Sequence, residues 1–356
     1  MRRYDIDAIR ISALFLLILY HAACAFQPWA IYFAFIVNPD TLESIWIFME
    51  MLNIWRLPIL FTVSGMGVFF ALQHRTWQEF FLNRGARVFI PLVFGSIFIA
   101  PLTLVLFQIH YQKEVEHIPQ PGHLWFLINI FYYSLLALPV FLYWNQHPNN
   151  IICRVSSAIL RTRFAVILLF SIPILIEALL LKPESYASFA LDPVHGPIIG
   201  FIFFSSGFFY ASLRDDFWHS VSNARFLSLI LAFSFYIIRV NFADLYPSHL
   251  LYTLATAFEA SNWILAAFGF GASYLNRPST VLTYLSAAVY PVYILHLPVQ
   301  QFFVGLLAPL GIPAILKLPV VIIATLGVCV SFFEIIRRIK YLRFCLGIKS
   351  FAKTQE

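Results

Sequence analysis

The chain has 356 residues, of which 61% are hydrophobic and 11% are charged, and its mean hydropathy is +0.81. This composition excludes an ordinary soluble domain and predicts a membrane protein with many helical spans. The formal net charge of +6 suits the anionic inner face of a membrane and gives no indication of nucleic-acid binding.

Ten apolar segments follow one another along the chain, and the connections between them are too short to fold as a soluble domain. In order, they cover residues 8–26, 45–72, 88–109, 123–144, 164–181, 196–213, 226–240, 250–274, 281–304 and 314–336. The sequence therefore predicts an all-α bundle of about ten transmembrane helices. We assign residues 1–340 to one membrane domain and residues 341–356 to a basic cytoplasmic tail.

Lysine and arginine are distributed unevenly around these segments. If the N-terminus is cytoplasmic, Arg10 and Arg56 lie inside helices. The outer side of the membrane then receives only four basic residues, Lys113, Lys182, Arg239 and Lys317. The other 17 of the 23 lysines and arginines lie on the cytoplasmic side, as the positive-inside rule describes. We therefore expect both termini in the cytoplasm.

The first segment carries two ionisable residues, Arg10 and His21, on one face. Eleven residues at about 100° each make roughly three full turns, so the two side chains point the same way about 16 Å apart. A cation near one surface is thereby aligned with a general base deep in the membrane, where an ionisable residue by default marks a functional site. The alternative is a snorkelling arginine and a hydrogen-bonded packing histidine.

The third segment is preceded by Arg84 and Arg87, two guanidinium groups that are three residues apart and can face one way on a helix. Guanidinium groups bind phosphate through paired charge-assisted hydrogen bonds. Ordinary positive-inside anchoring would explain the same two residues. An alignment with Arg10 favours the phosphate site.

Three histidines, His110, His117 and His123, follow at spacings of seven and six residues. These spacings put no two of them on one helical turn, so we expect no metal site. His117 would lie in a solvated loop. His123 and Trp125 would either meet a glycan or anchor their helix at the membrane interface.

Two later segments place a basic residue at the depth of His21. With a rise of about 1.5 Å per residue, His21, Arg56 and His296 lie about 20, 21 and 22 Å from the cytoplasmic surface. Three glutamates lie at or beyond this depth: Glu50, Glu177 and Glu259. The sequence therefore predicts a buried polar layer in the outer half of the bundle.

Six stretches resemble, in chain order, the membrane-bound acyltransferase family 3. Arg10 to His21 is similar to that family's Arg-x10-His signature, and Arg84 to Arg87 is similar to its Arg-x-x-Arg motif. The other four stretches are Trp55 to Gly65, His123 to Leu127, Tyr293 to His296 and Phe333 to Arg337. Arg56 favours the branch of glucan biosynthesis protein C, which succinylates periplasmic glucans, because much of the wider family has a histidine near this position.

The resemblance implies a multi-pass O-acyltransferase of the bacterial inner membrane. It would move a succinyl or acetyl group from cytoplasmic succinyl-CoA or acetyl-CoA to a hydroxyl of an extracytoplasmic glycan, such as a periplasmic glucan. Some relatives complete the transfer with an appended extracytoplasmic domain. This chain would act unaided or with a separate glycan-synthesis partner protein.

The same resemblance implies a donor site and a catalytic base. Arg84, Arg87 and Arg10 would hold the phosphates of acyl-CoA. His21 would act as a general base on the acceptor hydroxyl or as a transient acyl carrier.

Other residues would support this chemistry. Arg56 would stabilise an oxyanion or pair with the free carboxylate of a succinyl group. Glu50, Glu177 or Glu259 would orient His21. His296 would take part in catalysis, unless it only packs between helices.

A proton-coupled secondary transporter of a small solute is the alternative, because it would place similar residues in a cavity at the same depth. Such transporters usually have two related halves with broken helices. The sequence has no evident duplication, although Pro58, Pro173, Pro291 and Pro298 can break helices. Binding of acyl-CoA separates the two functions, since only the enzyme requires it.

Overall fold

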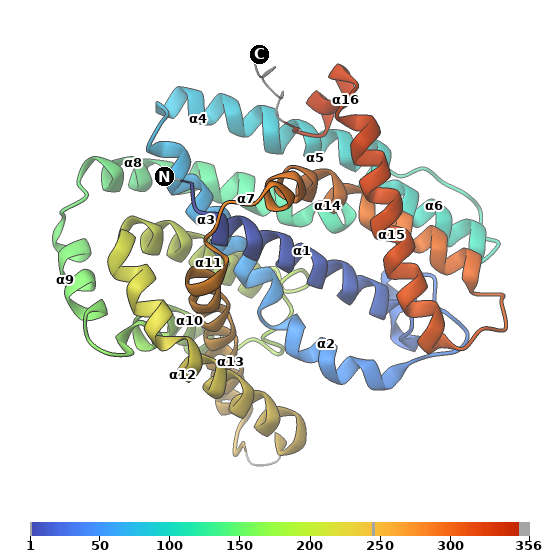
Figure 1. Ribbon diagram of the computed structural model, residues 1–356. Helices are drawn as coiled ribbons and strands as arrows, with labels where there is room; N and C mark the ends of the chain where they lie inside the picture. Colours follow the sequence, from blue (N-terminus) through green and yellow to red (C-terminus); the bar gives the residue numbers. More distant parts are fainter. Residues whose placement is uncertain (1, 244–245, 349–356) are drawn as a thin grey trace. The chain divides into compact units, whose positions relative to one another are not determined.

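The computed structural model describes residues 2–243 and 246–348, in which all regular structure is helical and no strand occurs (Figure 1). The α-helices are α1 (Tyr4–Cys24), α2 (Trp46–Asn53), α3 (Arg56–Leu72), α4 (Trp77–Arg84), α5 (Ile90–Phe94), α6 (Pro101–His110), α7 (Trp125–Leu136), α8 (Leu138–Gln146), α9 (Ile151–Leu160), α10 (Ala165–Leu181), α11 (His195–Ser212), α12 (Arg214–Asn241), α13 (His249–Phe270), α14 (Thr280–Leu307), α15 (Ala314–Ile336) and α16 (Lys340–Cys345). The predicted all-α fold is confirmed. Residues 349–356 of the predicted tail lie outside the described residues.

Every predicted apolar segment coincides with a helix, but fewer helices have the length and hydropathy of a complete membrane span. In the described part of the chain, six do: Tyr4–Cys24, Glu43–Leu72, Trp77–His110, Arg214–Asn241, Thr280–Leu307 and Ala314–Ile336. A seventh results if α7 and α8, which meet at a bend of 52°, cross together. The chain is a multi-pass membrane protein, and the predicted count of ten spans is not confirmed.

Three helices in predicted spans, α10, α11 and α13, lack the length or the hydropathy of a complete membrane span. Helix α10 has only 17 residues. Helix α11 contains three glycines and three serines, and α13 contains two threonines, a glutamate, a serine and an asparagine. These residues lower the hydropathy of α11 and α13 but allow close packing and hydrogen bonding between helices.

The predicted seventh segment, residues 226–240, is the second half of a longer helix. Helix α12 runs for 28 residues from Arg214, and its first half is too polar to be recognised as part of a span. Arg239 therefore lies inside a helix and is buried there. Lys317 is likewise buried in α15, where Nζ donates to Asn38 Oδ1 at 3.0 Å. Arg239 and Lys317 are thus both held inside helices, and their placement on the outer side of the membrane stays a prediction.

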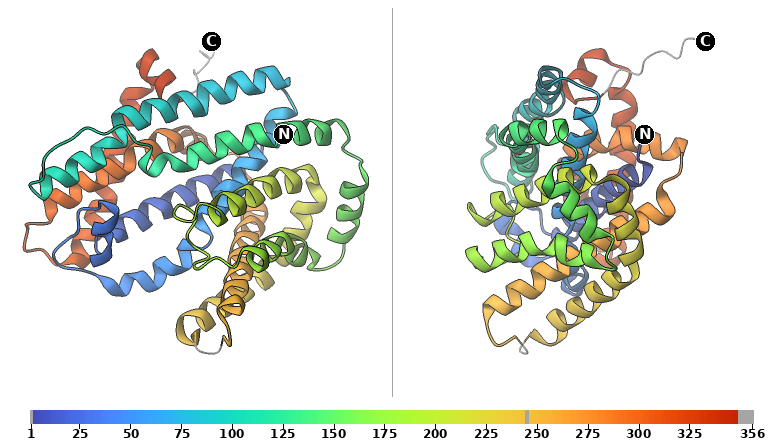
Figure 2. Two further views of the ribbon diagram at one scale, coloured as in Figure 1. Left: turned by 180° about the vertical axis from the view of Figure 1, so that it is seen from behind. Right: turned by 90° about the vertical axis from the view of Figure 1, so that its left-hand side faces the viewer.

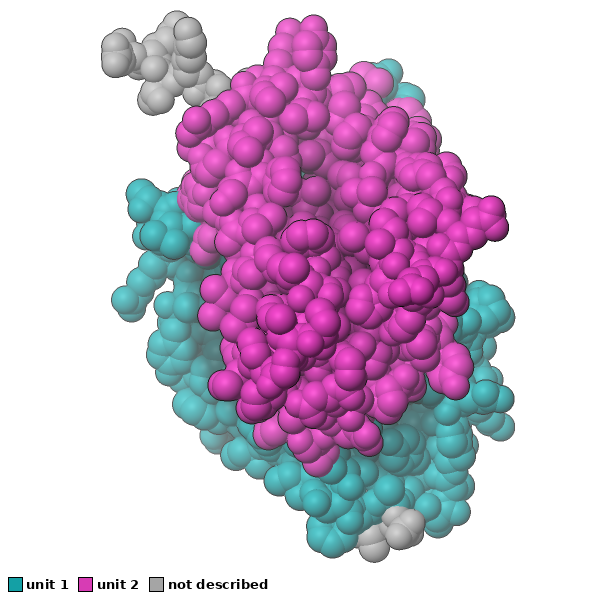
Figure 3. Space-filling model, turned by 90° about the vertical axis from the view of Figure 1, so that its right-hand side faces the viewer, with its two compact units in different colours: residues 1–13, 50–80, 132–282 teal, residues 14–49, 81–131, 283–356 magenta. Residues whose placement is uncertain are grey.

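The chain forms two compact units, coloured separately in Figure 3. Unit 1 comprises Met1–Ala13, Glu50–Phe80 and Tyr132–Leu282, and unit 2 comprises Leu14–Met49, Phe81–Phe131 and Thr283–Glu356. The division falls inside α1, α2, α4, α7 and α14, so each of these helices contributes residues to both units.

In unit 1, helices α3 and α11 pack backbone to backbone at two glycines. A Cβ atom at Gly65 would overlap the carbonyl oxygen of Phe204, and one at Gly207 would overlap that of Thr62. Only glycine lacks a Cβ, so these two positions set how closely the helices approach. Helices α12 and α13 of the same unit also lie side by side, as Figures 1 and 2 show.

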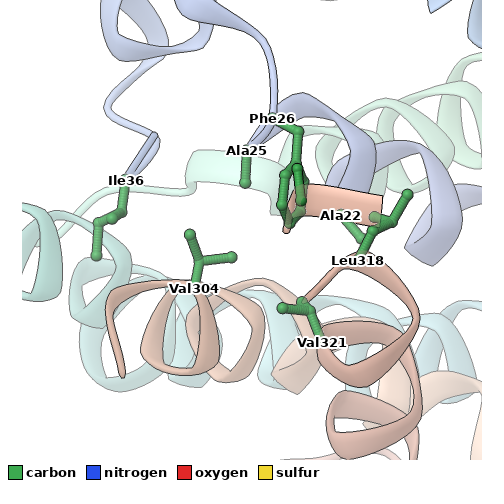
Figure 4. Packing of buried hydrophobic residues seen from close by; sticks show 8 residues of the cluster. Ala22, Ala25, Phe26, Ile36, Val304, Leu318 and Val321 are labelled. Carbon is green, nitrogen blue, oxygen red and sulfur yellow. The ribbon is translucent and has the colours of Figure 1, made fainter. Parts of the chain in front are cut away.

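In unit 2, an apolar cluster joins the C-terminal end of α1 to α14 and α15 (Figure 4). Its buried members are Ala22, Ala25, Phe26, Ile36, Val304, Ala314, Leu318 and Val321. The segment after α1 is also fastened by a polar contact, because Gln301 Oε1 accepts the backbone N–H of Ile36 at 2.7 Å. These contacts fix the last turn of α1, which carries His21.

Candidate active site

The structure brings together two of the predicted catalytic residues, His21 and His296, both in unit 2. His21 is half-buried in the last turn of α1, and His296 is fully buried on α14. His21 Nδ1 lies 2.9 Å from His296 Nε2, and the two ring planes differ by only 6°. Nearly parallel planes let the N–H of one ring point along the in-plane lone pair of the other, so the two rings share a hydrogen bond.

The backbone decides which of the two histidines donates. His296 Nδ1 lies 2.6 Å from the carbonyl oxygen of Tyr293. A carbonyl can only accept, so Nδ1 carries the hydrogen and Nε2 of neutral His296 is an acceptor. His21 Nδ1 must therefore donate to it. Neutral His21 is thus held in the tautomer whose lone pair is on Nε2, the form that can take a proton there.

A third histidine, His123, adjoins this pair. Its ring meets that of His296 edge to face, with centroids 5.2 Å apart and planes at 85°. The hydroxyl of Tyr293 donates to the backbone carbonyl of His123 at 2.6 Å. His123 Nε2 lies 3.0 Å from the carbonyl oxygen of Ile294, so Nε2 carries the hydrogen.

A proline explains why the Ile294 carbonyl accepts a side chain. Pro298 lies inside α14 and has no N–H, so the carbonyl four residues earlier, that of Ile294, lacks its regular helical donor. His123 supplies the missing hydrogen bond. The sequence thus sets the orientation of the His123 ring through a residue of another helix.

A similar contact occurs beside the π-helical turn Gly95–Ile99, where His117 meets the Ile97 carbonyl. His117 Nε2 lies 2.8 Å from that oxygen. His117 and His123 are therefore both engaged with backbone carbonyls. Within the described ranges, no group of three His, Cys, Asp or Glu side chains is arranged to hold a metal ion.

Glu177, one of the glutamates of the predicted layer, lies on α10 in unit 1 and binds His195 at the start of α11. Its Oε1 lies 2.6 Å from His195 Nδ1, and His195 Nε2 lies 3.0 Å from the carbonyl oxygen of Tyr186. Both ring nitrogens face oxygen atoms, so a proton lies between Nδ1 and the carboxylate. Asp192 Oδ1 accepts the N–H groups of Val194 and His195, both at 2.8 Å, and these bonds lower the pKa of Asp192.

Glu259, on α13, forms a buried ion pair with Arg239 of α12, also in unit 1. Arg239 Nε and Nη2 lie 2.7 and 3.2 Å from the two carboxylate oxygens, and Trp263 Nε1 donates to Oε1 at 3.2 Å. Glu50 Oε2 lies 3.8 Å from Arg239 Nη1. Neither Arg239 nor His195 was predicted from the sequence as the partner of these glutamates. The group that the structure places on His21 Nδ1 is His296.

The arginines of the predicted donor site lie on the N-terminal helices. Arg10, on α1 in unit 1, has Nη1 3.6 Å from Asp7 Oδ1. Arg84 ends α4, and Arg87 lies in the π-helical turn that follows; both are half-buried in unit 2. Such π-helical turns are frequent at functional sites. Arg56, the first residue of α3, is buried in unit 1.

These features define a multi-pass helical membrane protein with a paired-histidine site. A family model described as an acyltransferase domain matches residues 3–334, nearly the whole chain. The chain therefore belongs to acyltransferase family 3. Searches of the curated proteins and of the solved structures find no match.

Proposed function

We propose that this membrane acyltransferase moves a succinyl or acetyl group from cytoplasmic acyl-CoA to a hydroxyl of an extracytoplasmic glycan, such as a periplasmic glucan. The observation that carries the proposal is the hydrogen bond from His21 Nδ1 to His296 Nε2. Because His21 Nδ1 donates this bond, the lone pair of neutral His21 lies on Nε2. A general base needs such a lone pair to take the proton of a hydroxyl. Membership of the acyltransferase family supports the reaction class.

In the proposed reaction, His21 Nε2 takes the proton of the acceptor hydroxyl while its oxygen attacks the thioester carbonyl. The resulting tetrahedral intermediate collapses, the C–S bond breaks, and the thiolate of CoA leaves. Protonated His21 then returns its proton to the thiolate, so an ester and free CoA-SH are formed and His21 is neutral again. In the alternative sequence, Nε2 of His21 first accepts the acyl group itself.

The distribution of charge supports a cytoplasmic donor. With Arg239 and Lys317 buried inside helices, the predicted outer connections retain only Lys113 and Lys182 as basic residues. Arg84 and Arg87 would bind the phosphates of CoA on the opposite, basic side. The succinyl donor and the glucan acceptor rest on the resemblance to the glucan branch.

The test uses purified protein in detergent with radiolabelled succinyl-CoA or acetyl-CoA, each with and without periplasmic glucan. We expect glucan-dependent transfer of label from one of the two donors, and a rate reduced about a hundredfold or more with His21→Ala. Binding of acyl-CoA without transfer to any saccharide would contradict the acceptor. If neither donor binds, the acyltransferase proposal fails and the transporter interpretation gains.

A further inference from the structure

His123 presents a hydrogen-bond acceptor that nothing in the described residues meets. Because Nε2 donates to the Ile294 carbonyl, the lone pair of the neutral ring lies on Nδ1. This Nδ1 atom is buried and has no hydrogen-bond partner within the described part of the chain. A folded protein normally satisfies a buried polar atom, because leaving it unmet costs free energy.

Another histidine of this chain shows how a purely structural imidazole is satisfied. His195 is buried, and its two nitrogens meet the Glu177 carboxylate and the Tyr186 carbonyl. His123 is also held in place, because its ring Nε2 donates to the Ile294 carbonyl and its backbone carbonyl accepts from the Tyr293 hydroxyl. Only one of its two ring nitrogens, however, forms a hydrogen bond. The lone pair on His123 Nδ1 is therefore available to a hydrogen-bond donor that the described residues do not supply.

The position of this lone pair relates it to the proposed chemistry. The His123 ring lies edge to face on His296, which in turn binds His21, and all three belong to unit 2. We propose that His123 Nδ1 accepts a hydrogen bond from a second hydroxyl of the saccharide acceptor, next to the hydroxyl that His21 activates. This inference rests on the proposed function and names a specificity residue within it.

A saccharide hydroxyl suits this site better than an amide N–H of the pantetheine arm. His123 follows the exposed segment of residues 113–119, which the positive-inside assignment places on the extracytoplasmic face, where the glycan arrives. The donor arginines Arg84 and Arg87 lie at the other end of the Trp77–His110 run of helices. A saccharide carries several hydroxyl groups, so one can donate to His123 Nδ1 while another is activated by His21.

His123→Gln isolates the acceptor atom. The glutamine amide can still donate to the Ile294 carbonyl from the place of Nε2, but it puts no acceptor in the place of Nδ1. We expect the KM for glucan to rise about three- to tenfold, as loss of one neutral hydrogen bond implies. Acyl-CoA affinity should stay unchanged, because His123 is not among the proposed phosphate ligands.

His117→Gln is the matched control, because His117 also donates through Nε2 to a backbone carbonyl but is exposed. Its glucan KM should equal that of the wild type. His123→Asn keeps the acceptor and removes the donor. The amide oxygen of asparagine lies near the place of Nδ1, but the asparagine side chain is too short to donate to the Ile294 carbonyl. We expect His123→Asn to keep a lower glucan KM than His123→Gln.

Pro298→Ala tests the same atom without touching the histidine, which matters if His123→Gln does not fold. The restored N–H competes for the Ile294 carbonyl, so His123 loses its fixed tautomer and the glucan KM should rise. Pro319→Ala, at another proline inside a helix of unit 2, is its control and should leave that KM unchanged.

The outcomes separate this inference from the proposed function. If the wild type transfers acyl groups and His21→Ala does not, but His123→Gln and Pro298→Ala keep the wild-type KM for glucan, the inference is overturned and the proposed function stands. A rise in the KM for acyl-CoA alone would also overturn it, because the donor would then be the ligand of Nδ1. If the wild type transfers no acyl group to any saccharide, both fail.

Discussion

His21 Nδ1 donates to His296 Nε2 over 2.9 Å, and the Tyr293 carbonyl behind His296 fixes the direction of that bond. When His21 takes a proton on Nε2, the resulting positive charge is stabilised by the Nε2 lone pair of neutral, buried His296. The hydrogen bond from Nδ1 then becomes charge-assisted and stronger. In the proposed mechanism, His296 orients His21, a role for which the sequence suggested a carboxylate.

The first prediction concerns the base itself. His21→Ala should reduce acyl transfer by a factor of about 10² to 10⁴, the usual contribution of a general base. Acyl-CoA affinity should stay near the wild-type value, because no proposed phosphate ligand is removed. Initial rates with labelled donor and equilibrium binding of acyl-CoA check both points. A variant that keeps more than about a tenth of the wild-type rate would contradict this role.

The second prediction concerns His296 as a positioning residue. His296→Phe should lower kcat about ten- to a hundredfold with little change in either KM, because a buried hydrogen bond to His21 is lost and both tautomers become accessible. His296→Gln should recover part of this loss, since its amide oxygen can accept from His21 Nδ1 in the place of Nε2. Equal kcat values for the two variants would assign His296 to packing alone.

The third prediction addresses the donor site. Arg84→Ala and Arg87→Ala should each weaken acyl-CoA binding about ten- to a hundredfold, because a charge-assisted hydrogen bond contributes about 1.5–3 kcal/mol. Arg154→Ala, at an exposed arginine of α9, is the control and should bind normally. Calorimetric or filter-binding affinities decide the matter. If all three variants bind acyl-CoA alike, the Arg-x-x-Arg motif serves membrane topology only.

The fourth prediction tests the acyl group through Arg56. If the donor is succinyl-CoA, a guanidinium that pairs with the free carboxylate should discriminate against acetyl, because acetyl offers no such partner. Arg56→Gln should then depress succinyl transfer far more than residual acetyl transfer. Parallel rate measurements with the two donors check this. Equal losses would assign Arg56 to chemistry common to both acyl groups or to helix packing.

Composition and periodicity predicted most of the fold. Each apolar segment is helical, because a stretch of that length in a membrane can satisfy its backbone groups only within a helix. The boundary of α12 was missed because hydropathy does not register a polar helical start, here Arg214 with Asp215 and Asp216. The bend between α7 and α8 was missed as well, although Pro139 at the second position of α8 is its visible signal.

The site was predictable in its residue types but not in its pairing. His21 and His296 are 275 residues apart, and only depth in the membrane suggested that they lie at one level. Glutamates in apolar segments do require partners, so Glu177 and Glu259 signalled that a cation or donor lay nearby. Which one, His195 or Arg239, depends on helix packing that no local pattern contains. Pro298 indicated that the Ile294 carbonyl lacks a helical donor. The sequence did not show that His123 would supply the hydrogen bond, because that depends on which residues pack beside the proline.

The fifth prediction concerns the buried ion pair of Arg239 and Glu259. Removing one partner leaves an uncompensated charge among apolar helices, so Arg239→Gln should lower the free energy of unfolding by about 3–5 kcal/mol. Replacing both residues together, Arg239→Leu with Glu259→Leu, removes both charges and should recover most of this loss. Unfolding in mixed micelles, followed as the SDS fraction increases, gives the comparison.

Arg161 and Asp216 supply the matched control, because this pair of the same unit is 3.6 Å apart but its arginine side chain is 74% exposed. Arg161→Gln should change the free energy of unfolding by about 0–1 kcal/mol, since water already screens the pair. A loss at Arg239 no larger than at Arg161 would mean that water reaches Glu259 in the membrane. If the double variant were as unstable as Arg239→Gln, the loss would arise from helix packing between α12 and α13 rather than from an unpaired charge.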